Sequence, residues 1–324
     1  MESARARVGR VAVQTPLLES RDLSSALGFK LLVKAESLQT TGSFKFRGVA
    51  NRILRGAETE HAKEFLTWSS GNHGAALAEV CRLVGSHATV VVPPWIPAEK
   101  AANIEARGGA VVRAPKHENI PEFSMELASK IGASVVSAYD DIDVIAGQST
   151  AISEAIMQLK RRKDSFDADA VIVPCGSGSL AAGAALVLSE TPSIRLIGAE
   201  PVNAADTKAS LEVGRPIPGP SAGATICDAL RNSKPGGMAF GLLKDVVSKI
   251  VLVEDREVEA AMRLIFEKFK LVTEPSGAIA IAAALNESRM LRGLVVIALI
   301  TGGNIGALSF GNVLAAAAAA ELAT

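Results

Sequence analysis

Short, unbroken runs of valine, isoleucine, leucine and alanine recur along the chain, and longer stretches that mix alanine with polar residues separate them. An unbroken apolar run is typical of a strand buried on both faces. We therefore predict strands at residues 31–34, 65–69, 88–92, 110–113, 134–137, 170–174, 194–199, 249–253 and 293–299. The stretches between them predict helices at residues 74–84, 145–160, 180–189, 256–269 and 276–286. Strands that alternate with helices indicate an α/β fold with mostly parallel sheets.

Two stretches interrupt this alternation. Residues 214–236 are rich in glycine and proline and predict a long connection, and connections of this length are often functional. The alanines at 315–320 predict a terminal helix, because alanine is the best helix former.

The composition points to a folded protein whose partner is a small molecule. Of the 324 residues 48% are hydrophobic, and 34 Lys and Arg balance 34 Asp and Glu. Without a basic excess, binding to nucleic acid or to an anionic membrane surface is not expected. The longest apolar run, residues 294–300, is far shorter than the ~20 residues that cross a bilayer. Three widely spaced cysteines and the lack of a signal peptide favour a cytoplasmic protein without disulfides.

A cluster of glycines and serines follows the predicted strand 170–174 and opens the next helix; it consists of Gly176, Ser177, Gly178, Ser179 and Leu180. Backbone N–H groups and the helix dipole at such a position suit a bound phosphate. The spacing of Gly176, Gly178 and Ala181, with Glu200 after the next strand, also fits a loose dinucleotide fingerprint. That alternative predicts an NAD-dependent oxidoreductase, and a turn without a ligand is the third interpretation.

Lys45 lies between Phe44 and Phe46, next to a tight turn. Partial burial lowers the pKa of a lysine, so its amine becomes a nucleophile that can form a Schiff base. The alternative is a side chain that runs along apolar surface and ends in solvent.

Polar groups also follow other predicted strands, and the carboxyl ends of parallel strands are where open sheets bind ligands. After strand 65–69, two hydroxyls, an amide and an imidazole would form a nest for a carboxylate; they belong to Ser69, Ser70, Asn72 and His73. Thr301 places a neutral hydroxyl after the last strand. Oxygen atoms of Glu200, Ala204 and Asp206 suit Mg²⁺ or Ca²⁺, but two acids six residues apart are weak evidence, and a solvated loop fits them better.

Taken in order, these segments resemble the fold-type II pyridoxal-phosphate (PLP) enzymes, and within them the serine/threonine dehydratase and serine racemase branch. The resemblance extends from about residue 15 to residue 304 and rests on seven motifs: SLQTTGSFKFRG at 37–48, SSGNHG at 69–74, DVIAGQ at 143–148, GSGSL at 176–180, AEP at 199–201, TEPSGA at 273–278 and TGGN at 301–304. The sequence departs from the family at two motifs: Gly-Ser-Gly-Ser stands in place of four glycines, and Cys227-Asp228-Ala229 stands in place of Ala-Asp-Gly. Tyr139 stands where the branch has a residue that lies over the cofactor ring.

The resemblance implies a two-domain architecture like that of the tryptophan synthase β chain, and a homodimer. A large PLP-binding domain would comprise residues 1–59 and 144–324, and a small domain, residues 60–143, would carry the loop for the substrate carboxylate.

The resemblance also implies a role for each site residue. Lys45 would bind PLP as a Schiff base and remove the α-proton of the substrate. The cofactor ring would contact Phe44, its phenolic oxygen Asn72 and its pyridine nitrogen Thr301. Its phosphate would be bound by Gly176, Ser177, Gly178, Ser179 and Leu180. The substrate carboxylate would be bound by Ser69, Asn72 and His73, and a divalent cation by Glu200, Ala204 and Asp206.

The implied reaction is the dehydration of L-serine or L-threonine to a 2-oxo acid and ammonia. Ser70 matches the proton donor of serine racemases, so racemisation is an alternative. Hydroxyaspartate is another, and its second carboxylate would need a cation such as Lys116, His117 or Arg231. Rival classes are the NAD-dependent oxidoreductase and a silent binder that retains the fold.

Overall fold

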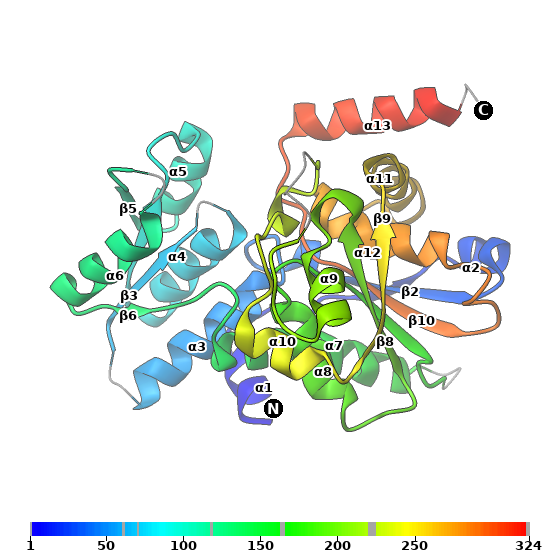
Figure 1. Cartoon of the computed structure of the whole chain (residues 1–324), viewed down its shortest axis with the longest axis horizontal. Coiled ribbons are helices and arrows are strands. Elements are labelled where there is room, and N and C mark those ends of the chain that lie inside the picture. Colours follow the sequence, from blue (N-terminus) through cyan, green and yellow to red (C-terminus); the bar gives the residue numbers. More distant parts are fainter. Residues whose placement is uncertain are drawn as a thin grey trace.

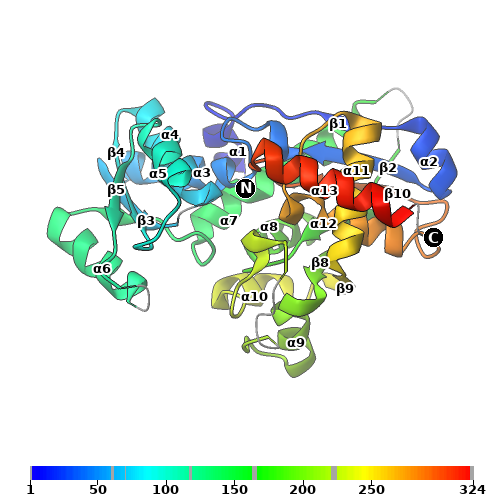
Figure 2. The same ribbon diagram turned by 90° about the horizontal axis from the view of Figure 1, so that it is seen from above.

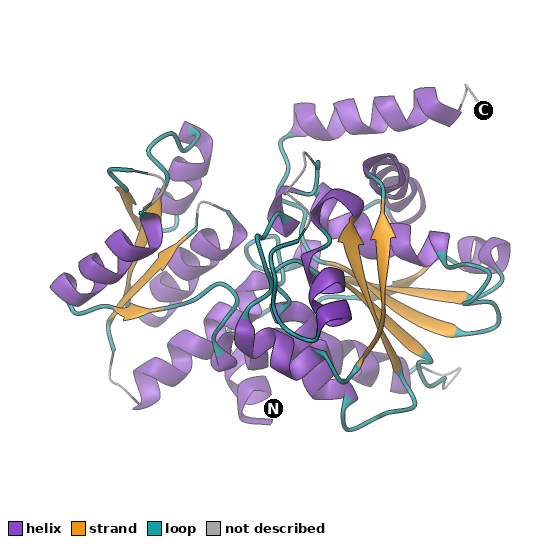
Figure 3. Ribbon diagram, viewed as in Figure 1, coloured by secondary structure: helices purple, strands orange, loops and turns teal. Residues whose placement is uncertain are grey.

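The structure of the protein is a computed structural model that describes residues 2–59, 62–69, 71–116, 119–162, 166–219 and 225–321. Two separate sheets organise these residues, and helices cover both faces of each sheet (Figure 1, Figure 3). Seen from above, the smaller sheet and its helices lie beside the larger part (Figure 2). The predicted α/β fold with mostly parallel sheets is confirmed.

The larger sheet has six strands in the order β1–β2–β10–β7–β8–β9. All its neighbouring strands are parallel except β1 and β2, which are antiparallel. The bounds are Leu17–Glu19 for β1, Lys30–Ala35 for β2, Ala170–Pro174 for β7, Arg195–Pro201 for β8, Val247–Val253 for β9 and Val295–Ile300 for β10.

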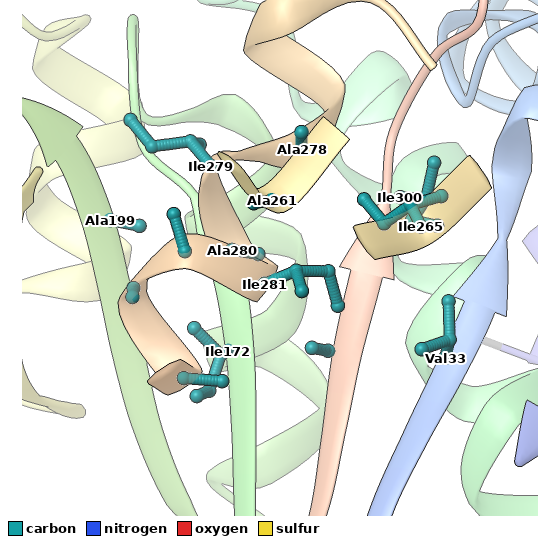
Figure 4. Close-up of a cluster of buried hydrophobic side chains, with 14 of the residues drawn as sticks. Val33, Ile172, Ala199, Ala261, Ile265, Ala278, Ile279, Ala280, Ile281 and Ile300 are labelled. Atoms are coloured by element: carbon teal, nitrogen blue, oxygen red, sulfur yellow. The ribbon is translucent and has the colours of Figure 1, made fainter. Parts of the chain in front are cut away.

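Alternate residues of each central strand enter different hydrophobic cores, which explains why these strands are apolar throughout. In β10, Val296 and Ile300 join a core with helices α11 (Asp255–Phe269) and α12 (Pro275–Asn286), part of which Figure 4 shows. Ile297 and Leu299 instead join the core with α7 (Ile142–Lys160) and α8 (Ser179–Leu188). The sheet is therefore held between two helical layers.

The smaller sheet has four parallel strands in the order β5–β4–β3–β6. Their bounds are Glu64–Trp68 for β3, His87–Val92 for β4, Ala110–Arg113 for β5 and Ser134–Val135 for β6. Helices α4 (Asn72–Val84) and α5 (Ala98–Glu105) share one core with this sheet, and α6 (Ile120–Ile131) covers the other face. The carboxyl ends of β3 and β4 thus lead directly into α4 and α5.

Helix α3 (Lys45–Thr59) connects the two sheets, because it contacts both α4 and α7. Its first residue is the lysine that the sequence singled out. The remaining helices are α1 (Glu2–Val8), α2 (Arg21–Leu27), η1 (Glu36–Leu38), η2 (Val202–Ala204), α9 (Asp206–Val213), η3 (Asp228–Leu230), α10 (Gly237–Leu243) and α13 (Ala307–Glu321).

The elements that were predicted differ from the observed ones only at their ends. Helices α3, α5 and α6 were not among the predicted ones, and neither was β1, because a three-residue antiparallel edge strand leaves little periodicity. The pattern analysis placed the start of β10 at residue 293, but Gly293 has a left-handed backbone (φ +79°) and forms the turn before the strand. The terminal helix begins at Ala307, well before the alanine run. The domain limits at residues 60 and 143 stay a prediction.

None of the described helices is both long enough and apolar enough to cross a membrane.

Candidate active site

A cavity of about 820 Å³ lies where the carboxyl ends of strands from the two sheets meet. Trp68 and Pro93 line it from the smaller sheet, and Pro174 and Thr301 line it from the larger. The sequence-predicted residues on its wall are Phe44, Lys45, Ser69, Asn72, His73, Gly176, Ser177, Gly178, Ser179, Leu180 and Thr301. The tertiary fold thus brings together four segments that are far apart in the chain.

Lys45 is a half-buried amine in this cavity. Its Nζ donates a hydrogen bond to the carbonyl oxygen of Ala138 at 3.0 Å and lies 5.0 Å from the centre of the Phe44 ring. Burial lowers the pKa of Lys45 from 10.5 to about 8, because the charged form loses its hydration. A substantial share of the amine is therefore neutral, and nucleophilic, near neutral pH.

The backbone around Lys45 is fastened to the loop that carries Thr301. Ser43 forms an antiparallel bridge with Gly302, and the N–H of Phe44 donates to the carbonyl oxygen of Thr301 at 3.0 Å. The Thr301 side chain is buried, with its hydroxyl 3.5 Å from the carbonyl oxygen of Ser276. These bonds fix the amine and the neutral hydroxyl relative to each other.

The glycine- and serine-rich loop forms the N-terminus of α8 at the cavity wall. Gly178 precedes the helix in a left-handed conformation (φ +86°), which glycine adopts without strain. Gly176 allows Leu230 to pack closely, since a Cβ there would lie 3.1 Å from the Leu230 Cα. The loop therefore presents N–H groups and two serine hydroxyls at a helix N-terminus, an arrangement that binds anions.

Asn72 and His73 begin α4 on the opposite side of the cavity. Asn72 Nδ2 donates to Glu274 Oε1 at 2.7 Å, and Asn72 Oδ1 accepts from Asn304 Nδ2 at 2.7 Å. His73 Nε2 lies 3.2 Å from the carbonyl oxygen of Val136, while Nδ1 has no hydrogen-bond partner among the described residues. Burial, and then the charge of Lys45, lower the pKa of His73 to about 3, so its ring is neutral.

Glu274 is a site residue that the sequence analysis did not assign. It lines the cavity, is 7% exposed, and burial raises its pKa to about 7. The available signal was its place in the TEPSGA motif. The motif was counted toward the family resemblance, but no role followed for its glutamate, because the partner of Glu274 is 202 residues away in the chain.

The predicted metal ligands lie outside the cavity wall, next to the glycine- and serine-rich loop. The carboxylate of Glu200 accepts the backbone N–H groups of Thr207 and Lys208, each at 2.9 Å. Both carboxylate oxygens of Asp206 are buried without a partner in the part of the chain that the structure describes. Burial raises the pKa of Glu200 to about 8 and that of Asp206 to about 7. Within the same part, no three His, Cys, Asp or Glu side chains are grouped to hold a metal ion.

Two of the predicted residues, Ser70 and His117, lie outside the described residues. Neither Lys116 nor Arg231 is on the cavity wall. Lys100 of α5 is there instead, with its Nζ 3.9 Å from an Asp228 carboxylate oxygen. Tyr139 is also on the wall, half-buried.

The chain is similar to known proteins over most of its length. The family described as pyridoxal-phosphate dependent enzyme matches residues 10–302. A serine racemase of Arabidopsis thaliana is 37% identical over 293 residues, which are 89% of this chain and 85% of that protein. An L-threo-3-hydroxyaspartate ammonia-lyase of Pseudomonas sp is 34% identical over 304 residues, 93% of each chain. The structure of the processed form of threonine deaminase isoform 2 from Solanum lycopersicum superposes with a TM-score of 0.89 at 30% identity, covering 96% of this chain and 90% of that one.

Proposed function

This chain belongs to the family of pyridoxal-phosphate dependent enzymes, and from that premise we propose that it dehydrates L-serine or L-threonine. The α-hydrogen and the β-hydroxyl of the substrate leave as water. Hydrolysis of the unsaturated amine that remains then releases ammonia and a 2-oxo acid.

The carrying observation is that one cavity is lined by candidate partners for the aldehyde, the phosphate and the pyridine nitrogen of PLP. Lys45 supplies an amine with a lowered pKa for the aldehyde. The N-terminus of α8 with Ser177 and Ser179 suits the phosphate, and Thr301 supplies a neutral hydroxyl for the pyridine nitrogen. The donor set fits PLP better than a dinucleotide, because a nicotinamide cofactor requires no buried lysine.

PLP, when bound, supplies the electron sink that allows the α-proton of an amino acid to be removed. Lys45 is the base that accepts this proton, since its lowered pKa lies close to the working pH. Thr301 offers the pyridine nitrogen a hydroxyl rather than a carboxylate, so it does not hold a proton there. With the Thr301 hydroxyl rather than a carboxylate at that position, loss of a β-leaving group would be favoured over transfer of the amino group.

The substrate carboxylate would bind among Ser69, Asn72 and His73 at the N-terminus of α4. His73 is neutral and cannot add positive charge to this site. Hydroxyl and N–H donors together with the helix dipole therefore supply the attraction.

Two variants of this activity have specific support. Racemisation is supported by the similarity to a serine racemase and by Ser70 in the SSGNHG motif; Ser70→Ala would then suppress racemisation and spare much of the elimination. Dehydration of hydroxyaspartate is supported by the similarity to an ammonia-lyase for that substrate and by Lys100, a cation on the cavity wall that would pair with a second carboxylate.

We also propose that Glu200, the carbonyl of Ala204 and Asp206 bind Mg²⁺ or Ca²⁺. The two buried carboxylate oxygens of Asp206, which have no partner among the described residues, support this, because a cation would compensate their burial. By its resemblance to the branch, the protein would act as a homodimer in the cytoplasm, which light scattering and fractionation of cells would test.

Absorbance of the purified protein in the near-visible range tests the proposal. We expect a yellow band that borohydride bleaches, with the reduced adduct on Lys45 in the peptide map, and release of a 2-oxo acid from L-serine, L-threonine or hydroxyaspartate. A protein that shows no such band even after PLP is added would refute the assignment.

A further inference from the structure

Glu274 occupies a helix N-cap without capping its helix. It precedes Pro275 at the start of α12, yet its side chain makes no hydrogen bond to the N–H groups of that helix. The carboxylate instead accepts from Asn72 Nδ2 at 2.7 Å, across the cavity wall and 202 residues away in the chain. Glu254, another N-cap glutamate of this chain, does bond the first turn of its own helix, so a different interaction determines the geometry at Glu274.

The contacts of Asn72 allow only one orientation of its amide. Nδ2 donates to the Glu274 carboxylate, and Oδ1 accepts from Asn304 Nδ2, which also donates to the carbonyl oxygen of Thr41 at 2.8 Å. A flipped amide would place Oδ1 against a carboxylate and Nδ2 against another NH₂ group. Because Nδ2 carries two N–H bonds and Glu274 takes one, the second stays available to a ligand in the cavity that Asn72 lines.

Two glycines make room for this arrangement. A Cβ at Gly302 would lie 2.2 Å from Glu274 Oε1 and 3.3 Å from Asn72 Nδ2. A Cβ at Gly42, which also has a left-handed backbone (φ +75°), would lie 2.4 Å from Asn304 Oδ1. The backbone at both positions is thus shaped to admit the two side chains that flank Asn72.

We propose that Glu274 and Asn304 are positioning residues that hold the Asn72 amide with an N–H toward the phenolic oxygen of bound PLP. This inference rests on the proposed function, since it assumes that PLP occupies the cavity. It assigns no contact with the substrate to either residue. The two act only through Asn72, and this distinguishes them from residues that bind the cofactor directly.

The surroundings of Glu274 make its hold on Asn72 dependent on pH. Burial raises its pKa to about 7, the Asn72 hydrogen bond lowers it, nearby Asp228 raises it and Lys100 lowers it. Lys45 and His73 line the same cavity, and the Cys227 thiol lies close enough for the Glu274 charge to raise its pKa. Above about pH 7 the Glu274 carboxylate is ionised and is the stronger acceptor for Asn72. Below that pH the hydrogen bond between the two side chains weakens.

A double-mutant cycle on the full chain tests the inference. The PLP dissociation constant is measured by absorbance titration for the wild type, Glu274→Ala, Asn72→Ala and the double variant. Loss of a hydrogen bond to a charged group predicts that Glu274→Ala weakens PLP binding about tenfold in the wild-type background. In the Asn72→Ala background the same change should have almost no effect, because the residue through which Glu274 acts is gone.

Equal weakening in both backgrounds, or none in either, would overturn the inference. Asn304→Ala repeats the cycle should Glu274→Ala fold poorly. Glu274→Gln keeps the size and an acceptor oxygen, so it should bind PLP within about threefold of the wild type but lose any spectral change that titrates near pH 7. A retained titration there would also contradict the role.

The matched control is Glu254→Ala, another N-cap glutamate, which does bond its own helix; it should leave PLP binding unchanged. Borohydride trapping on Lys45 distinguishes a failure of the positioning role from a failure of the proposed function. If every variant is trapped on Lys45 but the cycle is additive, only the positioning role fails. If the wild type is not trapped, the proposed function fails and the positioning role fails with it.

Discussion

Lys45 and Arg47 are two residues apart at the start of α3, yet their side chains enter very different surroundings. Two residues correspond to about 200° around a helix, so one side chain enters the cavity and the other the interior. Arg47 is 1% exposed and forms a two-pronged ion pair with Glu36, both bonds at 2.8 Å. Lys45 has one carbonyl acceptor and no carboxylate partner in the described part of the chain.

The charges around Arg47 compensate one another. Glu154 bonds both Arg47, at 2.8 Å, and the fully buried Lys34, at 2.5 Å. Thr15 donates to Glu36 at 2.5 Å. Burial by itself raises the pKa of Glu36, but the neighbouring Arg47 charge prevails, and the net shift is downward. Glu36 and Arg47 therefore each favour the charged form, and the cluster connects β2, α3 and α7.

On the cavity wall, Lys45, His73 and Glu274 form no ion pair with any residue that the structure describes. Burial shifts the pKa of Lys45 to about 8, that of His73 to about 3 and that of Glu274 to about 7, each toward its neutral form. The comparison teaches that buried charge alone does not mark a functional site. A cluster of ion pairs contributes to the structure, whereas titratable groups buried without an oppositely charged partner are ready to exchange protons or bind a ligand.

The largest expected effect is at Lys45. Replacing it by alanine should reduce release of the 2-oxo acid by about 10⁴-fold, because the base is lost. Stability should change little, since the half-buried amine forms one hydrogen bond to a backbone carbonyl and no ion pair with a described residue; urea unfolding checks this. Activity within tenfold of the wild type would assign the base elsewhere.

Arg47→Met, in contrast to Lys45→Ala, should act mainly by lowering the stability of the fold. It leaves Glu36 buried without its partner, and breaking such a pair costs about 3–5 kcal/mol of unfolding free energy. Urea titration of the full chain measures the loss. The control is Arg263→Met, whose pair with Glu267 is exposed; its effect should stay within about 0.5 kcal/mol. Similar losses for both variants would contradict the distinction between the two regions.

The pH dependence of amine reactivity compares the two environments directly. With a pKa of about 8 rather than 10.5, Lys45 holds about two orders of magnitude more neutral amine at pH 7.5 than an ordinary lysine. In protein freed of cofactor, the rate of PLP attachment trapped by borohydride should rise with pH and level off above about 8. A rate still rising at pH 10 would show an unperturbed amine. Lys34, held by Glu154, should not be labelled.

The smallest effect concerns Glu200 and Asp206. Because their pKa values are raised in the folded chain, metal-free stability should fall as the pH rises from about 4 to about 8. Mg²⁺ or Ca²⁺ at tenfold excess over its dissociation constant should restore about 1.4 kcal/mol at pH 8. Asp206→Asn should abolish this gain in a thermal melt. An equal gain in that variant would place the cation elsewhere.

Much of the molecule followed from local sequence. The apolar runs predict the central strands, since a strand buried on both faces must be apolar throughout. Lys45 between two phenylalanines and the glycine at position 178 were both recognisable, because each signal lies within a few neighbouring residues. The order of the motifs then indicated the family.

Only the tertiary structure decided which of the polar residues are uncompensated. Local sequence assigned no role to Glu274 or to Lys100. Their roles depend on Asn72, Asn304 and Asp228, which come from other segments. Burial and charge pairing are set by neighbours far apart in the chain. Local sequence therefore determined where the chemistry could be, and long-range packing determined which groups can perform it.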